Sequence, residues 1–141
     1  MGELVHIALG SNLGDRDAAL AAARLALRAL AGVRLLAETP VEETPPFGPA
    51  GQGDYLNQMV AVETTLTPHQ LLDALHGIER AAGRTRRVRW GPRTLDLDIV
   101  TFGDRTIDDE RLTVPHPGLA DRAFWQRELA HLAVRRDETH A

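Results

Sequence analysis

Short apolar strand patterns alternate with helical patterns along the whole 141-residue sequence, and this alternation restricts the fold more than any other feature. Apolar runs and two-residue alternation predict strands at residues 4–9, 33–39, 41–44, 55–66 and 95–102, with a short one at 106–107. Helical spacing of leucines predicts helices at residues 16–31, 68–82 and 120–134. The order β-α-β-β-α-β-α predicts an α+β, ferredoxin-like fold, in which helices pack on a mixed or antiparallel sheet in three α-β-α layers.

Capping residues mark the beginnings of two predicted helices. Asp15 or Asp17 can cap the first one, because a short acidic side chain accepts hydrogen bonds from the free amides of a first turn. At the second helix, Thr67 is the expected N-cap, Pro68 fits the first helical position, and Gln70 completes a capping box. We therefore expect both helices to begin close to these positions.

The length and composition fit one folded domain. Hydrophobic residues make up 43% of the chain and charged residues 26%, which is ordinary for a globular protein. We expect a single domain over residues 1–141, with a frayed tail at about residues 135–141. Proline, glycine and arginine concentrate at residues 45–54 and 84–93, and this composition predicts two surface loops.

Composition also excludes several classes of chemistry. The chain has no cysteine, which excludes disulfides, thiol catalysis and zinc–cysteine sites. It has no lysine, so a P-loop lysine and Schiff-base chemistry are excluded, and a bound anion must be held by arginine, histidine, backbone amides or metal ions. A net charge of -4 counts against nucleic-acid binding, and no apolar stretch reaches the length of a membrane span. Because the sequence opens on a strand pattern without a secretory signal, we expect a cytoplasmic protein, a monomer or small oligomer with the monomer favoured.

Two aspartates, Asp96 and Asp98, carry the most informative spacing in the sequence. Side chains two residues apart on a strand point to the same face, so the two carboxylates are expected to lie together. A divalent cation such as Mg²⁺ relieves their repulsion and uses one or two carboxylates together with substrate phosphates. Two solvated aspartates on an exposed sheet face are the alternative, and the spacing alone favours it.

An arginine-rich segment directly precedes the aspartate pair. Its basic residues are Arg80, Arg84, Arg86, Arg87, Arg89 and Arg93, and no acidic residue separates them. Guanidinium groups bind phosphate oxygens in bidentate fashion, so a polyphosphate with metal ions between arginines and aspartates explains the pattern. The alternative is a loop that binds nucleic acid, with Trp90 stacking on bases, but the net negative charge counts against it.

The segment RWGPRTLDLDI, residues 89–99, closely resembles the signature of the 6-hydroxymethyl-7,8-dihydropterin pyrophosphokinase family. Five further segments resemble the family in the same order: residues 8–14, 44–49, 54–57, 78–84 and 111–116. The resemblance spans roughly residues 7–124 and implies an enzyme of folate biosynthesis. Such an enzyme transfers pyrophosphate from ATP to the hydroxymethyl oxygen of the pterin and releases AMP.

The resemblance implies a role for each matching residue on the nucleotide side. Asp96 and Asp98 would hold two Mg²⁺ ions with ATP, and Asp96 would help to orient the attacking hydroxyl. Arg84 and Arg93 would stabilise charge on the transferred group. Further contacts to ATP are implied for Glu79, Arg86, Trp90, Arg111, Thr113 and His116. For His116 an ordinary loop position is the alternative.

The resemblance also implies a pterin site. Tyr55 and Phe124 would hold the flat ring between them, and Asn57 would hydrogen-bond its amide edge, since an amide both donates and accepts. Further pterin contacts are implied for Thr44, Phe47 and Trp90, the last of which would close over the site. Core packing is the alternative for Phe124, and a strand edge facing water is the alternative for Asn57.

The sequence departs from the family pattern at a few positions. Pro117 stands where many members carry an aromatic residue, and His76 stands where glutamine is common. The region after Phe124 lacks the usual proline-containing C-terminal segment. Apart from the enzyme, a small arginine-dependent nucleic-acid-binding module is the second hypothesis that the sequence supports.

Overall fold

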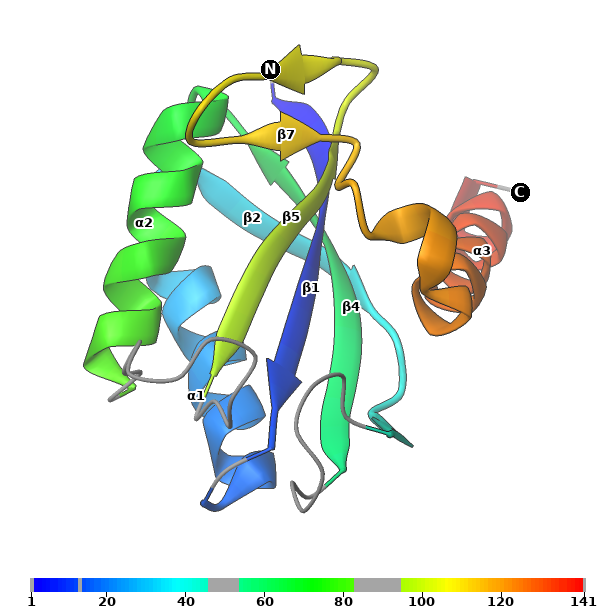
Figure 1. The fold of residues 1–141 in the computed structure, drawn as a ribbon. Helices are drawn as coiled ribbons and strands as arrows, with labels where there is room; N and C mark the ends of the chain where they lie inside the picture. The colour runs from blue at the N-terminus through cyan, green and yellow to red at the C-terminus, as the bar shows by residue number, and fades with distance from the viewer. Residues whose placement is uncertain (1, 13, 46–53, 83–94, 141) are drawn as a thin grey trace.

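A computed structural model describes residues 2–12, 14–45, 54–82 and 95–140 of the chain (Figure 1). The strands are β1 (Glu3–Ser11), β2 (Val33–Glu38), β3 (Glu42–Thr44), β4 (Tyr55–Thr64), β5 (Asp96–Phe102), β6 (Ile107–Asp108) and β7 (Thr113–Val114). The helices are α1 (Arg16–Ala29), α2 (Pro68–Ala81) and α3 (Ala123–His140), with a 3-10 turn, η1 (Leu119–Asp121), before α3. The predicted order of the main elements is therefore confirmed for the described residues, and β7, which pairs with β6, is a short strand that was not predicted.

The main sheet is antiparallel and has β1 near its centre. Its strand order is β2-β4-β1-β5, and β3 continues the pairing along β4. The two longest strands, β1 and β4, are buried along most of their length because both faces of the sheet are covered. In the register, Gly10 of β1 lies opposite Asn57 of β4 on one side and opposite Asp96 of β5 on the other.

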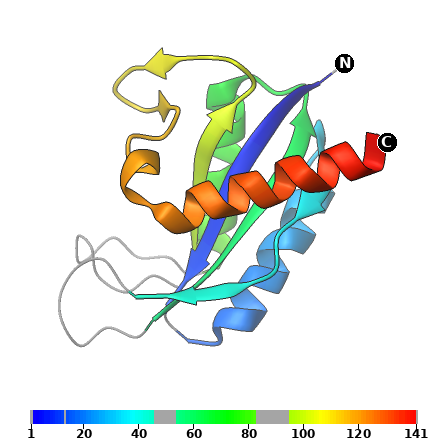
Figure 2. The ribbon, with the colours of Figure 1, turned by 90° about the vertical axis from the view of Figure 1, so that its right-hand side faces the viewer.

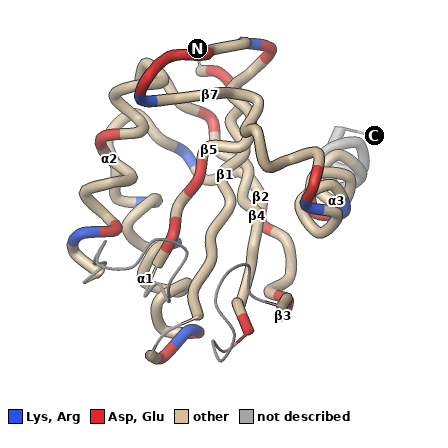
Figure 3. Tube along the Cα trace, viewed as in Figure 1, with Lys and Arg blue, Asp and Glu red and all other residues tan. Residues whose placement is uncertain are grey.

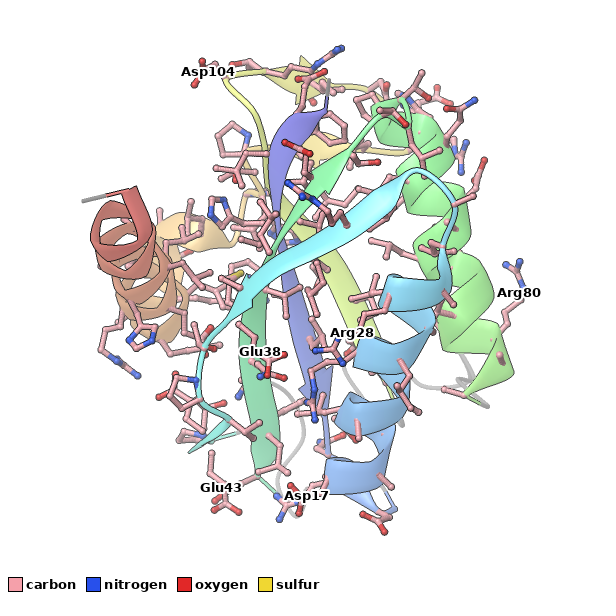
Figure 4. All side chains as sticks on the ribbon, turned by 180° about the vertical axis from the view of Figure 1, so that it is seen from behind. Asp17, Arg28, Glu38, Glu43, Arg80 and Asp104 are labelled. Atoms are coloured by element: carbon pink, nitrogen blue, oxygen red, sulfur yellow. The ribbon has the colours of Figure 1, made fainter. Side chains whose placement is uncertain are left out.

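Helices cover both faces of this sheet, which confirms the predicted three α-β-α layers. One apolar cluster joins α1 and α2 to the sheet and includes Leu20, Leu27, Leu71 and Leu75. A second cluster forms on the opposite face, where α3 packs (Figure 2). We call the second face the α3 face. Viewed from behind, α1 and α2 lie side by side on one side of the sheet, and α3 lies on the other side (Figure 4).

Helix beginnings follow the capping residues that the sequence indicates. The Asp15 side chain accepts a hydrogen bond of 3.0 Å from the amide of Ala18, so Asp15 rather than Asp17 caps α1. Thr67 and Gln70 form both hydrogen bonds of the capping box at α2. Glu38 of β2 also lies 3.8 Å from the guanidinium groups of Arg24 and Arg28 in α1, and Figure 4 labels Arg28 and Glu38.

The C-terminal helix differs most from the sequence-based expectation. The pattern predicted a helix at residues 120–134 followed by a frayed tail, whereas α3 begins at Ala123 and continues to His140. Residues 135–140 contain arginine, glutamate and other helix-compatible residues without glycine or proline, so nothing in this segment stops the helix. Among the described residues, no helix is both long and apolar enough to cross a membrane.

Candidate active site

The two aspartates of β5 lie on the α3 face, as their spacing predicted. Leu97 and Ile99 alternate with them and are buried in the cluster beneath α1 and α2. Asp96 and Asp98 are only half-buried, and the Asp98 side chain keeps 45% of its surface exposed. The strand therefore presents two carboxylates to the same open region, an arrangement that suits a divalent cation.

Glu79 of α2 is fixed to the strand that carries the aspartates. It is 5% exposed, and its Oε2 atom accepts a hydrogen bond of 2.8 Å from the backbone amide of Leu97, the residue between Asp96 and Asp98. A carboxylate that accepts a backbone hydrogen bond at this depth satisfies a donor that would otherwise be left without a partner. Glu79 thereby sets the position of α2 relative to β5.

An open pocket of about 340 Å³ brings six of the predicted nucleotide-binding residues together. These residues are Glu79, Asp96, Asp98, Arg111, Thr113 and His116. They come from α2, β5, the β6–β7 hairpin and the segment after β7, which are separated in sequence but meet at one edge of the sheet (Figure 1). In Figure 3 acidic positions mark β5, and acidic and basic positions mark the hairpin beside β7. The pocket is therefore lined by charges of both signs.

The His116 ring has a defined orientation in this pocket. Its Nδ1 atom accepts a hydrogen bond of 2.9 Å from the amide of Gly118, so the neutral ring carries its proton on Nε2. Nε2 lies 3.7 Å from Oδ1 of Asp98. The backbone amide of His116 also donates to the carbonyl of Val100 at 2.8 Å, which attaches this segment to β5. His116 thus presents an N–H donor beside the carboxylate pair.

The β6–β7 hairpin is held against α2 by an exposed ion pair and an exposed hydrogen bond. Arg111 pairs with Asp73, and His69 Nε2 lies 2.8 Å from Oδ2 of Asp109. The Arg111 guanidinium holds the pKa of the Asp73 carboxyl below its usual value. The pKa of Asp109 is lowered chiefly by the backbone amides of Arg111 and Leu112, which donate to its Oδ1 atom. These contacts attach the hairpin, which carries Arg111 in the pocket lining, to α2.

The predicted pterin-binding residues of β3 and β4 lie on the other side of β1. Asn57 donates a side-chain hydrogen bond to the Thr44 hydroxyl, and both residues are buried. By strand alternation Tyr55 and Asn57 point to the α3 face, like Met59 in the second apolar cluster. A side-chain carbon added at Gly10 would lie 3.4 Å from Oδ1 of Asn57 and 3.5 Å from Cδ1 of Tyr55. Gly10 is itself buried, so its backbone separates this group from the aspartates of β5 without adding a side chain between them.

Phe124 is the second residue of α3 and is half-buried at the margin of the second apolar cluster. Its ring lies 6.2 Å from that of Trp125, at an interplanar angle of 66°. Phe124 and Tyr55 thus lie on the α3 face of the sheet and come from different elements. The packing of Phe124 against the cluster also agrees with the core-packing alternative, and its contact with a pterin stays a prediction.

Comparisons with known proteins identify the family of the chain. The family model of 7,8-dihydro-6-hydroxymethylpterin-pyrophosphokinase (HPPK) matches residues 6–134. Proteins named 2-amino-4-hydroxy-6-hydroxymethyldihydropteridine pyrophosphokinase are similar to the chain in three bacteria. The identity is 47% over 133 residues in Pseudomonas aeruginosa, covering 94% of this chain and 82% of the relative. In Methylorubrum extorquens the identity is 44% over 128 residues, covering 91% of this chain and 81% of the relative. In Bacillus subtilis the identity is 42% over 143 residues, covering 100% of this chain and 86% of the relative.

The chain belongs to the HPPK family. It is therefore an enzyme, a pyrophosphokinase of folate biosynthesis, and the family resemblance inferred from the sequence is confirmed. The remaining members of the predicted HPPK site lie outside the described residues. They are Phe47, Arg84, Arg86, Trp90 and Arg93.

Several residues that line the pocket were not assigned from the sequence. His76, Asp109, Glu110 and Pro117 also line the pocket. His76 could have been found from its spacing, because Leu72, His76 and Glu79 follow one another at four and three residues on one helix face, and all three line the pocket.

Trp125 is a further unassigned residue, and it contacts the His116 ring from the buried side. Its distance of seven residues from Leu132 is a helical-face signal, since both are buried in the second cluster. The contact between Trp125 and His116 is a tertiary contact, and the helical spacing of Trp125 and Leu132 does not predict it.

Proposed function

We propose that this chain transfers pyrophosphate from ATP to the hydroxymethyl oxygen of 6-hydroxymethyl-7,8-dihydropterin and releases AMP. The observation that supports this proposal is the position of the two β5 carboxylates. They share one face and one pocket with Arg111, Thr113 and His116, while Asn57 and Tyr55 lie across Gly10 on the same face. A nucleotide and a flat heterocycle placed in these two regions would meet at β1.

In the proposed reaction, the hydroxymethyl oxygen forms a bond to the β-phosphorus of ATP. The bond between that phosphorus and the oxygen it shares with the α-phosphate breaks, and AMP leaves with that oxygen. The proton of the hydroxyl passes to solvent or to a carboxylate. Asp96 supports this step because a half-buried carboxylate can accept a hydrogen bond from the hydroxyl and orient its lone pair.

The side chains around the pocket suit the negative charge of a triphosphate. His116 presents its Nε2–H, and Arg111 contributes a guanidinium from the hairpin. Arg84 and Arg93, which the family resemblance assigns to the transferred group, would add two further cations. Positioning and charge stabilisation of this kind carry most of the catalysis in phosphoryl transfer.

Asp96 and Asp98 are the residues that we propose hold Mg²⁺. The donor set fits: both are carboxylates, both lie on one face, and both keep exposed surface. Among the described residues there is no group of three or more histidine or acidic side chains arranged to hold a metal ion. When bound, magnesium neutralises charge on the phosphate oxygens.

The pterin would lie against Tyr55 and Phe124, with its polar edge toward Asn57. The Asn57 side chain is already oriented by its hydrogen bond to Thr44, which leaves its Oδ1 atom available as an acceptor. Thr44 and Phe47 would offer backbone groups to the same edge. We also propose a cytoplasmic, monomeric enzyme, which cell fractionation and size-exclusion chromatography with light scattering would test.

The deciding experiment is an AMP-formation assay with ATP, Mg²⁺ and 6-hydroxymethyl-7,8-dihydropterin. We expect Asp98→Ala to remain folded and to lose activity by about a hundredfold or more, because the carboxylate acts on the reacting phosphates. Asp104→Ala is the matched control, since Asp104 lies beyond the opposite end of β5 (Figure 4) and should leave the rate unchanged. Equal rates in wild type and Asp98→Ala would refute the assignment. Affinity for nucleic acid that falls steeply with salt, without AMP formation, would favour the second hypothesis.

A further inference from the structure

A single buried indole, that of Trp125, contacts residues on both sides of the proposed site. Trp125 is 4% exposed and lies in the first turn of α3. It packs in the second apolar cluster on the α3 face, with Ala8 and Val100 among its neighbours. Because Ala8 pairs with Asp98 in the sheet register, the indole lies over the strands that carry the site.

The first contact is with His116. The two ring centroids are 4.9 Å apart and the rings are almost perpendicular, at 89°, which is a favourable edge-to-face arrangement. The hydrogen bond from Gly118 fixes one edge of the imidazole, and the indole restricts its rotation from another side. With both contacts in place, Nε2 faces Asp98 and the pocket.

The second contact is with Phe124, the neighbouring residue in α3. Adjacent residues of a helix point about 100° apart, so the burial of Trp125 directs Phe124 toward the margin of the cluster. The 66° angle between the two rings, at 6.2 Å, is again of the edge-to-face type. The face of the indole also carries Arg122, whose guanidinium carbon lies 4.5 Å from the ring centroid.

We propose that Trp125 is a positioning residue for both substrates, because its indole fixes the His116 ring on the nucleotide side and the Phe124 ring on the pterin side. This inference rests on the proposed function, and Trp125 itself touches neither the reacting atoms nor the substrates. Loss of the indole is expected to weaken both subsites together, whereas an ordinary core residue affects stability alone.

The test compares wild type with Trp125→Met, which fills apolar space without a ring, and Trp125→Phe, which keeps an aromatic ring. We expect Trp125→Met to raise KM for both ATP and the pterin by about two- to tenfold, the range that matches one edge-to-face aromatic pair. Trp125→Phe should have KM values close to those of wild type. Calorimetric titration with α,β-methylene-ATP plus Mg²⁺, and separately with the pterin, compares the Kd values of the same variants without turnover.

A spectroscopic measurement separates positioning from stability. In wild type, ¹⁵N NMR of the His116 ring should show an Nδ1 acceptor and a protonated Nε2, and Trp125→Met should mix the two tautomers. Leu132→Ala is the control, because Leu132 is buried in the same cluster about 10 Å further along α3. It should lower Tm and leave the tautomer and both KM values unchanged.

Two results would overturn the proposal. The first is a Trp125→Met variant whose KM values and His116 ¹⁵N shifts equal those of wild type. The second is a Leu132→Ala variant in which KM and the ¹⁵N shifts change as much as in Trp125→Met. If Trp125→Met does not fold, Trp125→Leu takes its place under the same criteria. A wild-type protein that forms no AMP would instead contradict the proposed function, and the NMR comparison would still decide whether Trp125 orients His116.

Discussion

The Oε2 atom of Glu79 accepts a hydrogen bond of 2.8 Å from the amide of Leu97, the residue between Asp96 and Asp98. This bond joins α2 to the edge of β5 at the position where the two aspartates emerge. A buried carboxylate that the sequence resemblance assigned to nucleotide binding therefore also fixes the backbone of the acidic pair.

Glu79→Ala is expected to lower both stability and activity. Without the carboxylate, the Leu97 amide loses its acceptor in a buried environment, which costs about 1–3 kcal/mol of unfolding free energy. Glu79→Gln keeps an acceptor oxygen and should restore most of the stability. Urea denaturation measures the difference, and equal stability of the Ala and Gln variants would show that the hydrogen bond contributes nothing.

Gly10→Ala tests whether the pterin lies against the backbone between Asn57 and Asp96. The added carbon would lie in ordinary contact with Asn57 and Tyr55, so we expect the fold and Tm to change little. A ring that lies against this backbone would be displaced, and KM for the pterin should rise by about tenfold, as for a crowded packing site. KM for ATP is the internal control. An unchanged KM for the pterin would place the ring elsewhere.

Local patterns predicted much of the fold and part of the site. Period-two alternation placed Asp96 and Asp98 on one face, and the capping box at Thr67 fixed the start of α2. Both features depend on residues that are near neighbours in sequence, so the spacing of residue types predicts them. The order of strands in the sheet, with β1 between β4 and β5, was not contained in any local spacing.

The contacts that the sequence did not supply are tertiary. Asp73 and Arg111 are 38 residues apart, and only the packing of the hairpin on α2 brings them together. Trp125 and His116 meet because the segment after β7 hydrogen-bonds to β5 and α3 then crosses the sheet. The extension of α3 to His140 was missed because no apolar periodicity marks residues 135–140, although their helix propensity is adequate.

Asp73→Asn should strengthen ATP binding. Asp73 pairs with Arg111, and its charge partly neutralises the guanidinium that faces the proposed triphosphate. Both side chains are at least half exposed, so loss of the pair should change stability by less than about 1 kcal/mol. The Kd of the Mg²⁺–α,β-methylene-ATP complex should fall by about two- to threefold. A higher Kd would show that Asp73 orients Arg111 instead of competing with the nucleotide.

Glu128→Gln is expected to change how stability depends on pH. Burial raises the pKa of the Glu128 carboxyl from 4.5 to about 8, and the neighbouring Glu42 carboxylate adds to the shift while Arg127 opposes it. The folded protein therefore holds a proton that the unfolded chain releases above pH 4.5. The stability linked to this proton is fully present below pH 4.5 and is lost as the pH rises to about 8.

Glutamine cannot ionise, so the Tm of Glu128→Gln should exceed that of wild type by an amount that grows between pH 5 and 8, the window set by these two values. Asp104→Asn, a change at an exposed acid, is the control and should follow the wild-type curve. Parallel Tm curves for wild type and Glu128→Gln across this range would show that Glu128 is already ionised in the folded protein.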